Sequence, residues 1–225
     1  VLNFIAGTSL ADNLNGMDEG DNIDAGNQTS EINDYNGDGI ADIITTYTYA
    51  PVLNFIAGTS LADNLNGMDE GDNIDAGEGN DTLFGGGASD VLNGGRGDDS
   101  LTGASSATNG VGEIDRLQGD AGADIFVLGT NTTTFYDDGD SSSQGTTDYA
   151  LIADFDSSED VIELSISQTY YLAGSPLGSV AGTGVFIDND GTAGFSGNDE
   201  LVGLLQGVSL TSGVITGDTA GFSLV

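Results

Sequence analysis

Aspartates recur at nine-residue intervals through the centre of this chain, and their spacing predicts a row of cation sites. Six consecutive nine-residue units begin at Gly58, Gly67, Ala76, Gly85, Gly94 and Gly103, and five of the six carry Asp at the sixth place. Glycine-rich turns adopt positive φ and let backbone carbonyls face an ion. The carboxylate adds an anionic oxygen, and calcium takes six to eight oxygens at flexible geometry. We therefore expect calcium to bind in these turns.

The predicted repeat ligands extend to both sides of this run. After a seven-residue break, from Gly103 to Asn109, the register resumes. Upstream, residues 1–26 recur unchanged as residues 52–77, which indicates tandem duplication or homogenisation of a longer array. We expect every sixth-place aspartate to be a calcium ligand. These residues are Asp12, Asp21, Asp63, Asp72, Asp81, Asp90, Asp99, Asp115 and Asp124.

A different type of calcium loop is predicted between the two copies of the duplicated segment. Its candidate ligands follow the spacing D-x-[DN]-x-D-G, and they are Asp34, Asn36, Asp38 and Asp42. The twelfth place is Thr45 rather than the glutamate of an EF-hand, so the loop resembles FG-GAP or dockerin-type calcium loops more closely. An Asx-rich turn without an ion is the alternative. Residues 43–49 are β-branched and aromatic and predict a strand.

A third candidate calcium loop lies near the carboxyl end. Its acidic residues are Asp188, Asp190 and Asp199. Gly191 comes two places too early for an EF-hand loop, so the spacing favours a calcium site and an ordinary acidic turn about equally.

The elements that must position the repeat turns are very short strands. The eighth place of the five units is always aliphatic, and its residues are Leu65, Ile74, Leu83, Leu92 and Leu101. Since strand side chains alternate between faces, one such residue per strand points inward. Two units then make one coil, which places Asp63, Asp81 and Asp99 along one edge and Asp72 and Asp90 along the other. A flexible Gly/Asp-rich linker, the alternative, lacks a phased apolar residue.

These features predict an all-β fold, a parallel β-roll (β-solenoid) of nine-residue repeats with a C-terminal β cap. The stretch AGEGNDTLFGGGASDVLNGGRGDDSLTG resembles the RTX (repeats-in-toxin) family of calcium-binding β-rolls. GEIDRLQGDAGADIFVLG and YALIADFDSSEDVIELS resemble the segments that close such rolls in secreted bacterial proteins, particularly cyanobacterial ones. The resemblance implies several bound Ca2+ ions and an extracellular location. It does not identify a biological role, because RTX rolls occur in toxins, proteases, lipases, adhesins and surface layers.

Four segments are expected along the chain. They are residues 1–26, the first copy of the duplicated module; 27–51, the loop and strand; 52–127, the RTX roll; and 128–225, a β-rich cap. Strands of the cap are predicted at residues 125–128, 149–155, 161–166, 170–172, 184–187 and 201–205. The cap should shield the last coil, as the end of a solenoid requires.

Composition limits the partners and the chemistry. The chain has 37 Asp and Glu against 2 Lys and Arg, a formal charge of -35, so no basic surface for nucleic acid can form. No run approaches the roughly 18 apolar residues of a membrane span. The chain lacks His, Cys and Lys, which removes the usual means of activating a nucleophile, and we do not expect an enzyme. A carboxylate pair for glycoside hydrolysis remains available in principle, without Trp to bind sugar.

Two functions are compatible with this sequence. The first is an extracellular calcium-binding structural protein that self-assembles into a surface or matrix filament or layer. It would be a homo-oligomer or homopolymer, with calcium-mediated contacts to polysaccharide or a surface. The second is a C-terminal, calcium-responsive secretion or folding module of a larger secreted enzyme, toxin or adhesin. The duplicated module favours the first function.

Overall fold

The computed structural model describes residues 54–140, 144–191, 196–217 and 219–225, together with the backbone of four strands nearer the amino terminus. The chain divides into two compact units, Val1–Val52 and Leu53–Val225. In the first unit, β1 (Phe4–Ala6) and β2 (Asn22–Asp24) pair in parallel, and β3 (Gln28–Asn33) and β4 (Asp42–Tyr47) pair antiparallel. Strand β4 confirms the strand predicted from residue 43.

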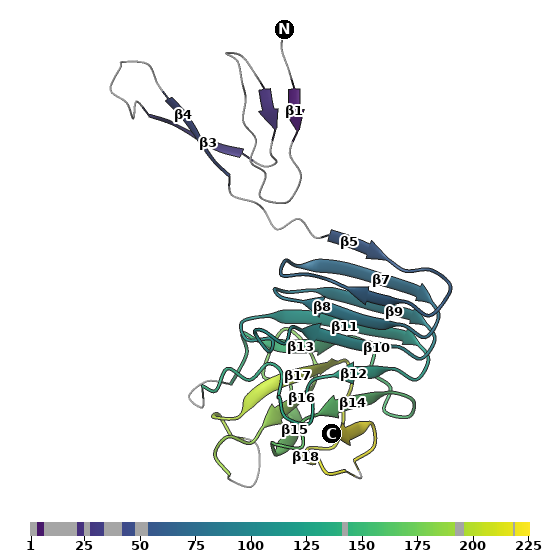
Figure 1. The fold of residues 1–225 in the computed structure, drawn as a ribbon. Helices are drawn as coiled ribbons and strands as arrows, with labels where there is room; N and C mark the ends of the chain where they lie inside the picture. Colours follow the sequence, from purple (N-terminus) through teal and green to yellow (C-terminus); the bar gives the residue numbers. More distant parts are fainter. Residues whose placement is uncertain are drawn as a thin grey trace. The chain divides into compact units, whose positions relative to one another are not determined.

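The second unit contains two parallel sheets whose strands alternate along the chain (Figure 1). One sheet consists of β6 (Asn64–Asn66), β8 (Thr82–Gly86), β10 (Ser100–Ala104), β12 (Ile125–Val127), β14 (Val161–Leu164) and β19 (Phe222–Leu224). The parallel part of the other sheet consists of β5 (Asn54–Ala57), β7 (Asp72–Glu78), β9 (Val91–Arg96), β11 (Ile114–Ala121), β13 (Tyr149–Ile152) and β17 (Glu200–Gln206). Within the described residues there is no helix. The structure thus confirms an all-β parallel roll.

The register within each sheet follows the repeat. Leu65 pairs with Leu83, and Leu83 with Leu101, so each coil takes two nine-residue units. Across the seven-residue break the interval lengthens, and Leu101 pairs with Phe126. The break is accommodated in the 105–113 turn between β10 and β11, because the pairing resumes in register beyond it.

The eighth-place side chains form the core between the two sheets. Those of Ile74, Leu83, Leu92 and Leu101 are completely buried. Neighbouring strands in a sheet are about 4.8 Å apart, so these side chains stack in continuous apolar rows. Burying each one contributes about 1.5–3 kcal/mol to folding.

Parallel stacking continues past residue 127, where the roll was expected to end. Strands β13 and β17 extend one sheet, and β14 and β19 extend the other. The β17 edge then continues antiparallel through β16 (Gly182–Ile187), β15 (Tyr170–Gly174) and β18 (Gly213–Val214). The six strands predicted from residue 125 onward are all present. Phe155 fills the core at this end and packs edge-on against Phe126, with ring centroids 6.4 Å apart.

Candidate calcium sites in the turns of the roll

The sixth-place aspartates form two hydrogen-bonded ladders, one along each edge of the roll. On one edge the backbone N–H of Asp63 donates to Oδ1 of Asp81 at 2.7 Å, and that of Asp81 donates to Oδ1 of Asp99 at 2.7 Å. The ladder continues from Asp99 to Asp124 at 2.9 Å. On the other edge, Asp72 donates to Asp90 at 2.7 Å. The predicted separation of the aspartates between two edges is therefore confirmed.

The second ladder and the end of the first have the same geometry. The N–H of Asp90 donates to Oδ1 of Asp115 at 2.8 Å, and the N–H of Asp124 donates to Oδ1 of Asp160 at 3.0 Å. Asp160 was not among the predicted ligands. Its turn, residues 155–160, contains no glycine. Asp160 nevertheless lies 36 residues after Asp124, a whole number of nine-residue units, and Ile162 occupies the eighth place of the same unit.

Among the described residues, four turns adopt left-handed backbone at both their second and fourth places. The residues are Gly77 and Gly79, Gly86 and Ala88, Gly95 and Gly97, and Asp120 and Gly122. At Gly97 a Cβ atom would collide with the carbonyl oxygen of Gly79, one coil earlier. At Gly95 it would collide with the carbonyl oxygen of Gly77. Successive turns therefore stack closely, with a backbone carbonyl of one coil against the glycine of the next. Backbone carbonyl oxygens are hard donors of the type that calcium binds.

In three of these left-handed turns, the sixth-place carboxylate has an oxygen that the described part of the protein does not satisfy. Asp81, Asp90 and Asp99 are each at most 2% exposed, and within the described part of the chain Oδ2 of each has no hydrogen-bond partner. At Gly85 and Gly94 a Cβ atom would contact Oδ2 of Asp90 and Asp99, so the first-place glycine makes room for the carboxylate. A buried anionic oxygen without a donor is costly unless a cation neutralises it. The residues present fit calcium.

The electrostatics of the ladders favour cation binding. Burial, together with the neighbouring carboxylates of Asp115 and Asp72, raises the pKa of Asp90 to about 8. Burial also raises the pKa of Asp124 to about 6, with Asp160 and Asp99 adding to the increase. The pKa of Asp99 is raised by burial as well. Divalent cations would stabilise the ionised form of all these groups.

Three other turns satisfy the same carboxylate oxygen from within the protein, and we call them closed turns. Their second-place N–H donates to Oδ2 of the sixth-place aspartate. The pairs are Thr59 with Asp63 at 2.7 Å, Met68 with Asp72 at 2.8 Å, and Asp156 with Asp160 at 2.8 Å. None of the three has glycine at its second place. We call the four left-handed turns, which end at Asp81, Asp90, Asp99 and Asp124, open turns.

Asp115 is satisfied in another way. The hydroxyl of the fully buried Tyr136 donates to Oδ2 of Asp115 at 2.6 Å. Burial raises the pKa of Asp115 to about 6 even so. Tyr136 thus supplies Oδ2 of Asp115 with the donor that the corresponding oxygens of Asp81, Asp90 and Asp99 lack. It comes from a segment without repeat spacing, so the sequence pattern could not identify it.

The remaining predicted ligands fall into two groups. Asp12, Asp21, Asp34, Asn36 and Asp38 lie outside the described residues, and Asp42 begins β4 with no description of its side chain. Asp188, Asp190 and Asp199 are brought together, with one carboxylate oxygen from each within 4.8 Å of the others. Oδ1 of the buried Asp199 has no hydrogen-bond partner in the described part of the chain. Calcium binding by these three residues stays a prediction.

The stacked strands, glycine turns and buried carboxylates define a calcium-binding parallel β-roll. A family model of the RTX calcium-binding nonapeptide repeat matches the chain in four copies, at residues 57–92, 66–101, 84–106 and 109–131. The chain therefore carries RTX repeats, which are calcium-binding rather than catalytic elements. No curated protein matches the chain. In the part of the chain that the structure describes, no helix is long and apolar enough to cross a membrane.

Proposed function

We propose that this is an extracellular calcium-binding structural protein whose chains join end to end through the duplicated module. The observation that carries the proposal is the shared register of the two copies. In β1 and β2, Phe4 pairs with Asn22 and Ile5 with Ile23. In β5 and β7, the corresponding residues 51 positions later pair in the same way. Each copy of the module thus forms the same parallel strand pair.

The open edges of the roll provide a place for such a strand pair to add. Strand β5 pairs only with β7, and β6 only with β8, so each is the terminal strand of its sheet in the described structure. Terminal strands present unpaired N–H and C=O groups to another chain. A module from a second copy would continue the coil in register. Such a head-to-tail contact does not close on itself and produces a filament.

Calcium would stabilise the assembled form. We assign the ions to the open turns, with Asp81, Asp90, Asp99 and Asp124 as carboxylate ligands and backbone carbonyls as the others. External calcium is millimolar, a concentration that suits weak multi-site loops, and this supports an extracellular location. Calcium shared between coils would also make the filament sensitive to chelators.

Deletion of residues 1–51 tests the proposal. The compact unit Leu53–Val225 remains intact, so the shortened chain should fold, bind calcium and stay monomeric by light scattering and electron microscopy. The full chain should form filaments in millimolar calcium and lose them in chelator. Substituting Ile23→Asp should also prevent assembly without shortening the chain, because its counterpart Ile74 is completely buried.

Two results would overturn the proposal. If the shortened chain polymerises like the full chain, the duplicated module is not the assembly element. If the full chain stays monomeric at high concentration in calcium, the filament function fails, and the secreted-module function becomes the better one.

A further inference from the structure

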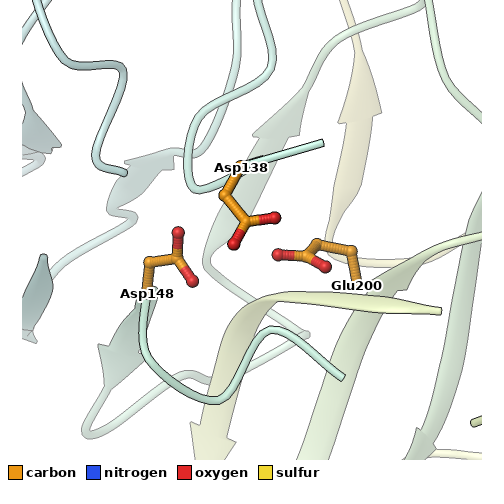
Figure 2. A group of neighbouring side chains, drawn as sticks. All are labelled: Asp138, Asp148 and Glu200. Atoms are coloured by element: carbon orange, nitrogen blue, oxygen red, sulfur yellow. The ribbon is translucent and has the colours of Figure 1, made fainter. Parts of the chain in front are cut away.

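Three carboxylates converge outside the repeat turns, at the side of the cap. Figure 2 shows Asp138, Asp148 and Glu200 directed toward a common space, and one oxygen from each lies within 4.8 Å of the other two. They come from three separate segments of the chain. Asp138 follows Tyr136 in a loop, Asp148 immediately precedes β13, and Glu200 is the first residue of β17.

The topology explains why two of these residues meet. Strands β13 and β17 are parallel neighbours, with Ala150 paired to Gly203. Asp148 and Glu200 therefore lie at the same ends of adjacent strands. The segment before β13 is held against β17 by a hydrogen bond from the N–H of Leu201 to the carbonyl of Gln144, at 3.1 Å.

Glu200 is the residue that indicates a ligand. Its side chain is completely buried, and neither Oε1 nor Oε2 has a hydrogen-bond partner in the part of the chain that the structure describes. Gly145, at a φ of 58°, lies beside it, and a Cβ atom there would come within 2.6 Å of Oε1. A glycine at this position keeps the space next to the carboxylate open.

Asp148 is similarly under-satisfied. It is 1% exposed, and its oxygens accept long hydrogen bonds, from the N–H of Gly112 at 3.3 Å and from Oγ1 of Thr147 at 3.2 Å. Asp138 is exposed and accepts from the N–H of Asp140. The site thus has two buried carboxylates and one exposed carboxylate at its mouth.

The protein cannot neutralise this group with its own cations. The chain has two basic side chains, and Arg96 pairs with Glu78 at 3.4 Å while Arg116 donates to Gln118 at 2.7 Å. Burial, together with the carboxylates of Asp138 and Asp148, raises the pKa of Glu200 to about 8. An isolated buried carboxylate is costly, so a bound cation or a proton must compensate.

We propose that Asp138, Asp148 and Glu200 form a calcium site separate from the repeat turns, which ties the starts of β13 and β17 to the loop after Tyr136. Three carboxylates supply only hard oxygen donors, and the chain has no His or Cys to favour zinc. Calcium accepts irregular sets of carboxylate, carbonyl and water oxygens, whereas magnesium requires a near-ideal octahedron. The ion would stabilise the packing of the cap against the roll.

Crystals of the full chain grown in calcium and soaked in terbium test this site. We expect an anomalous peak between the three carboxylates, in addition to peaks at the open turns, which serve as an internal control. Glu200→Gln keeps the shape of the side chain and should remove the cap peak while the turn peaks remain. Glu159→Gln is the matched control, because Glu159 is exposed and away from the cluster. It should leave every peak in place.

A second measurement, in solution, is the number of calcium ions bound per chain. It is determined by atomic emission after equilibrium dialysis. Glu200→Gln should bind about one ion fewer than the parent, and Glu159→Gln the same number. If Glu200→Gln fails to fold, Asp138→Asn, at the exposed mouth of the site, provides the test instead. It should also bind about one calcium ion fewer than the parent. Two results would overturn the proposal: terbium peaks at the turns but none at the cap, or the same number of bound calcium ions in the parent, Glu200→Gln and Asp138→Asn. Protonation of Glu200 would then explain how its burial is tolerated.

Discussion

The second place of each turn determines what the sixth-place aspartate can do. When that place is Thr59 or Met68, its N–H donates to the carboxylate four residues later, at 2.7–2.8 Å. When it is a glycine at positive φ, as at Gly77 and Gly95, the N–H is turned away and the buried Oδ2 has no donor. The same Asp at the same place is thus part of a closed turn in one case and a candidate cation ligand in the other.

Equivalent substitutions in the two kinds of turn should differ in their effect on calcium binding. Asp81→Asn keeps the Oδ1 acceptor for the Asp63 N–H but removes the anionic oxygen of an open turn, and should lower calcium affinity by about tenfold or more, equal to roughly 1.4 kcal/mol or more. Asp63→Asn, in a closed turn, should change it little. Each substitution removes one charge, so long-range electrostatics is matched. Equal losses by titration calorimetry would contradict the distinction.

At the scale of the elements, the nine-residue pattern was sufficient to predict the roll. Apolar residues at the eighth place of successive units predicted the buried rows, and the aspartates predicted the two edges along which the ladders run. Asp160 was missed because its turn, which begins at Phe155, has no glycine. Local spacing also could not reveal Tyr136, which folds back onto Asp115, nor the cluster at Glu200, whose members are far apart in sequence. Contacts made by the tertiary fold leave no periodic signal.

Gly97, at the fourth place of its open turn, should be essential to the stacking of coils, because the neighbouring coil leaves no room for a side chain there. Gly97→Ala places a Cβ against the carbonyl oxygen of Gly79 at a φ of 130°. The left-handed backbone alone costs about 1–2 kcal/mol, and the collision adds to it. Gly178→Ala is the control, since a Cβ there meets nothing within 4 Å, and should stay within about 0.5 kcal/mol. Urea unfolding in saturating calcium measures the stability of both variants. Similar unfolding midpoints for Gly97→Ala and Gly178→Ala would contradict close stacking at Gly97.

The apolar rows should account for much of the stability of the roll. Leu92→Ala removes a completely buried side chain between the sheets and should lower the free energy of unfolding by about 2–5 kcal/mol. Leu61→Ala makes the same change at a side chain that is 73% exposed, and should have little effect. Thermal unfolding of the calcium-loaded chains compares the stabilities of the two variants. A small effect at Leu92 would mean that calcium, rather than the core, holds the sheets together.

For the whole molecule, charge opposes folding until cations bind. The chain carries a formal charge of -35, and the ladders place buried carboxylates on successive coils. Two unit charges one strand spacing apart, about 4.8 Å, repel by roughly 3 kcal/mol at an effective dielectric constant of about 20. Each ladder repeats that repulsion along its length. The hydrophobic rows must overcome it in the absence of calcium, whereas bound ions convert it into attraction.

Removing calcium from the full chain should therefore unfold most of the roll. In excess chelator we expect the circular dichroism of β-structure to be largely lost. Millimolar calcium should restore it cooperatively, because an ion bound between two coils, as we propose, would order both. Magnesium at the same concentration should restore much less, since it demands tighter octahedral geometry than stacked carbonyls and carboxylates provide. Sodium chloride at matched ionic strength separates specific binding from screening. Full recovery in salt or magnesium would show that charge neutralisation alone folds the chain, and an unchanged spectrum and melting temperature in chelator would show that the open turns do not require an ion.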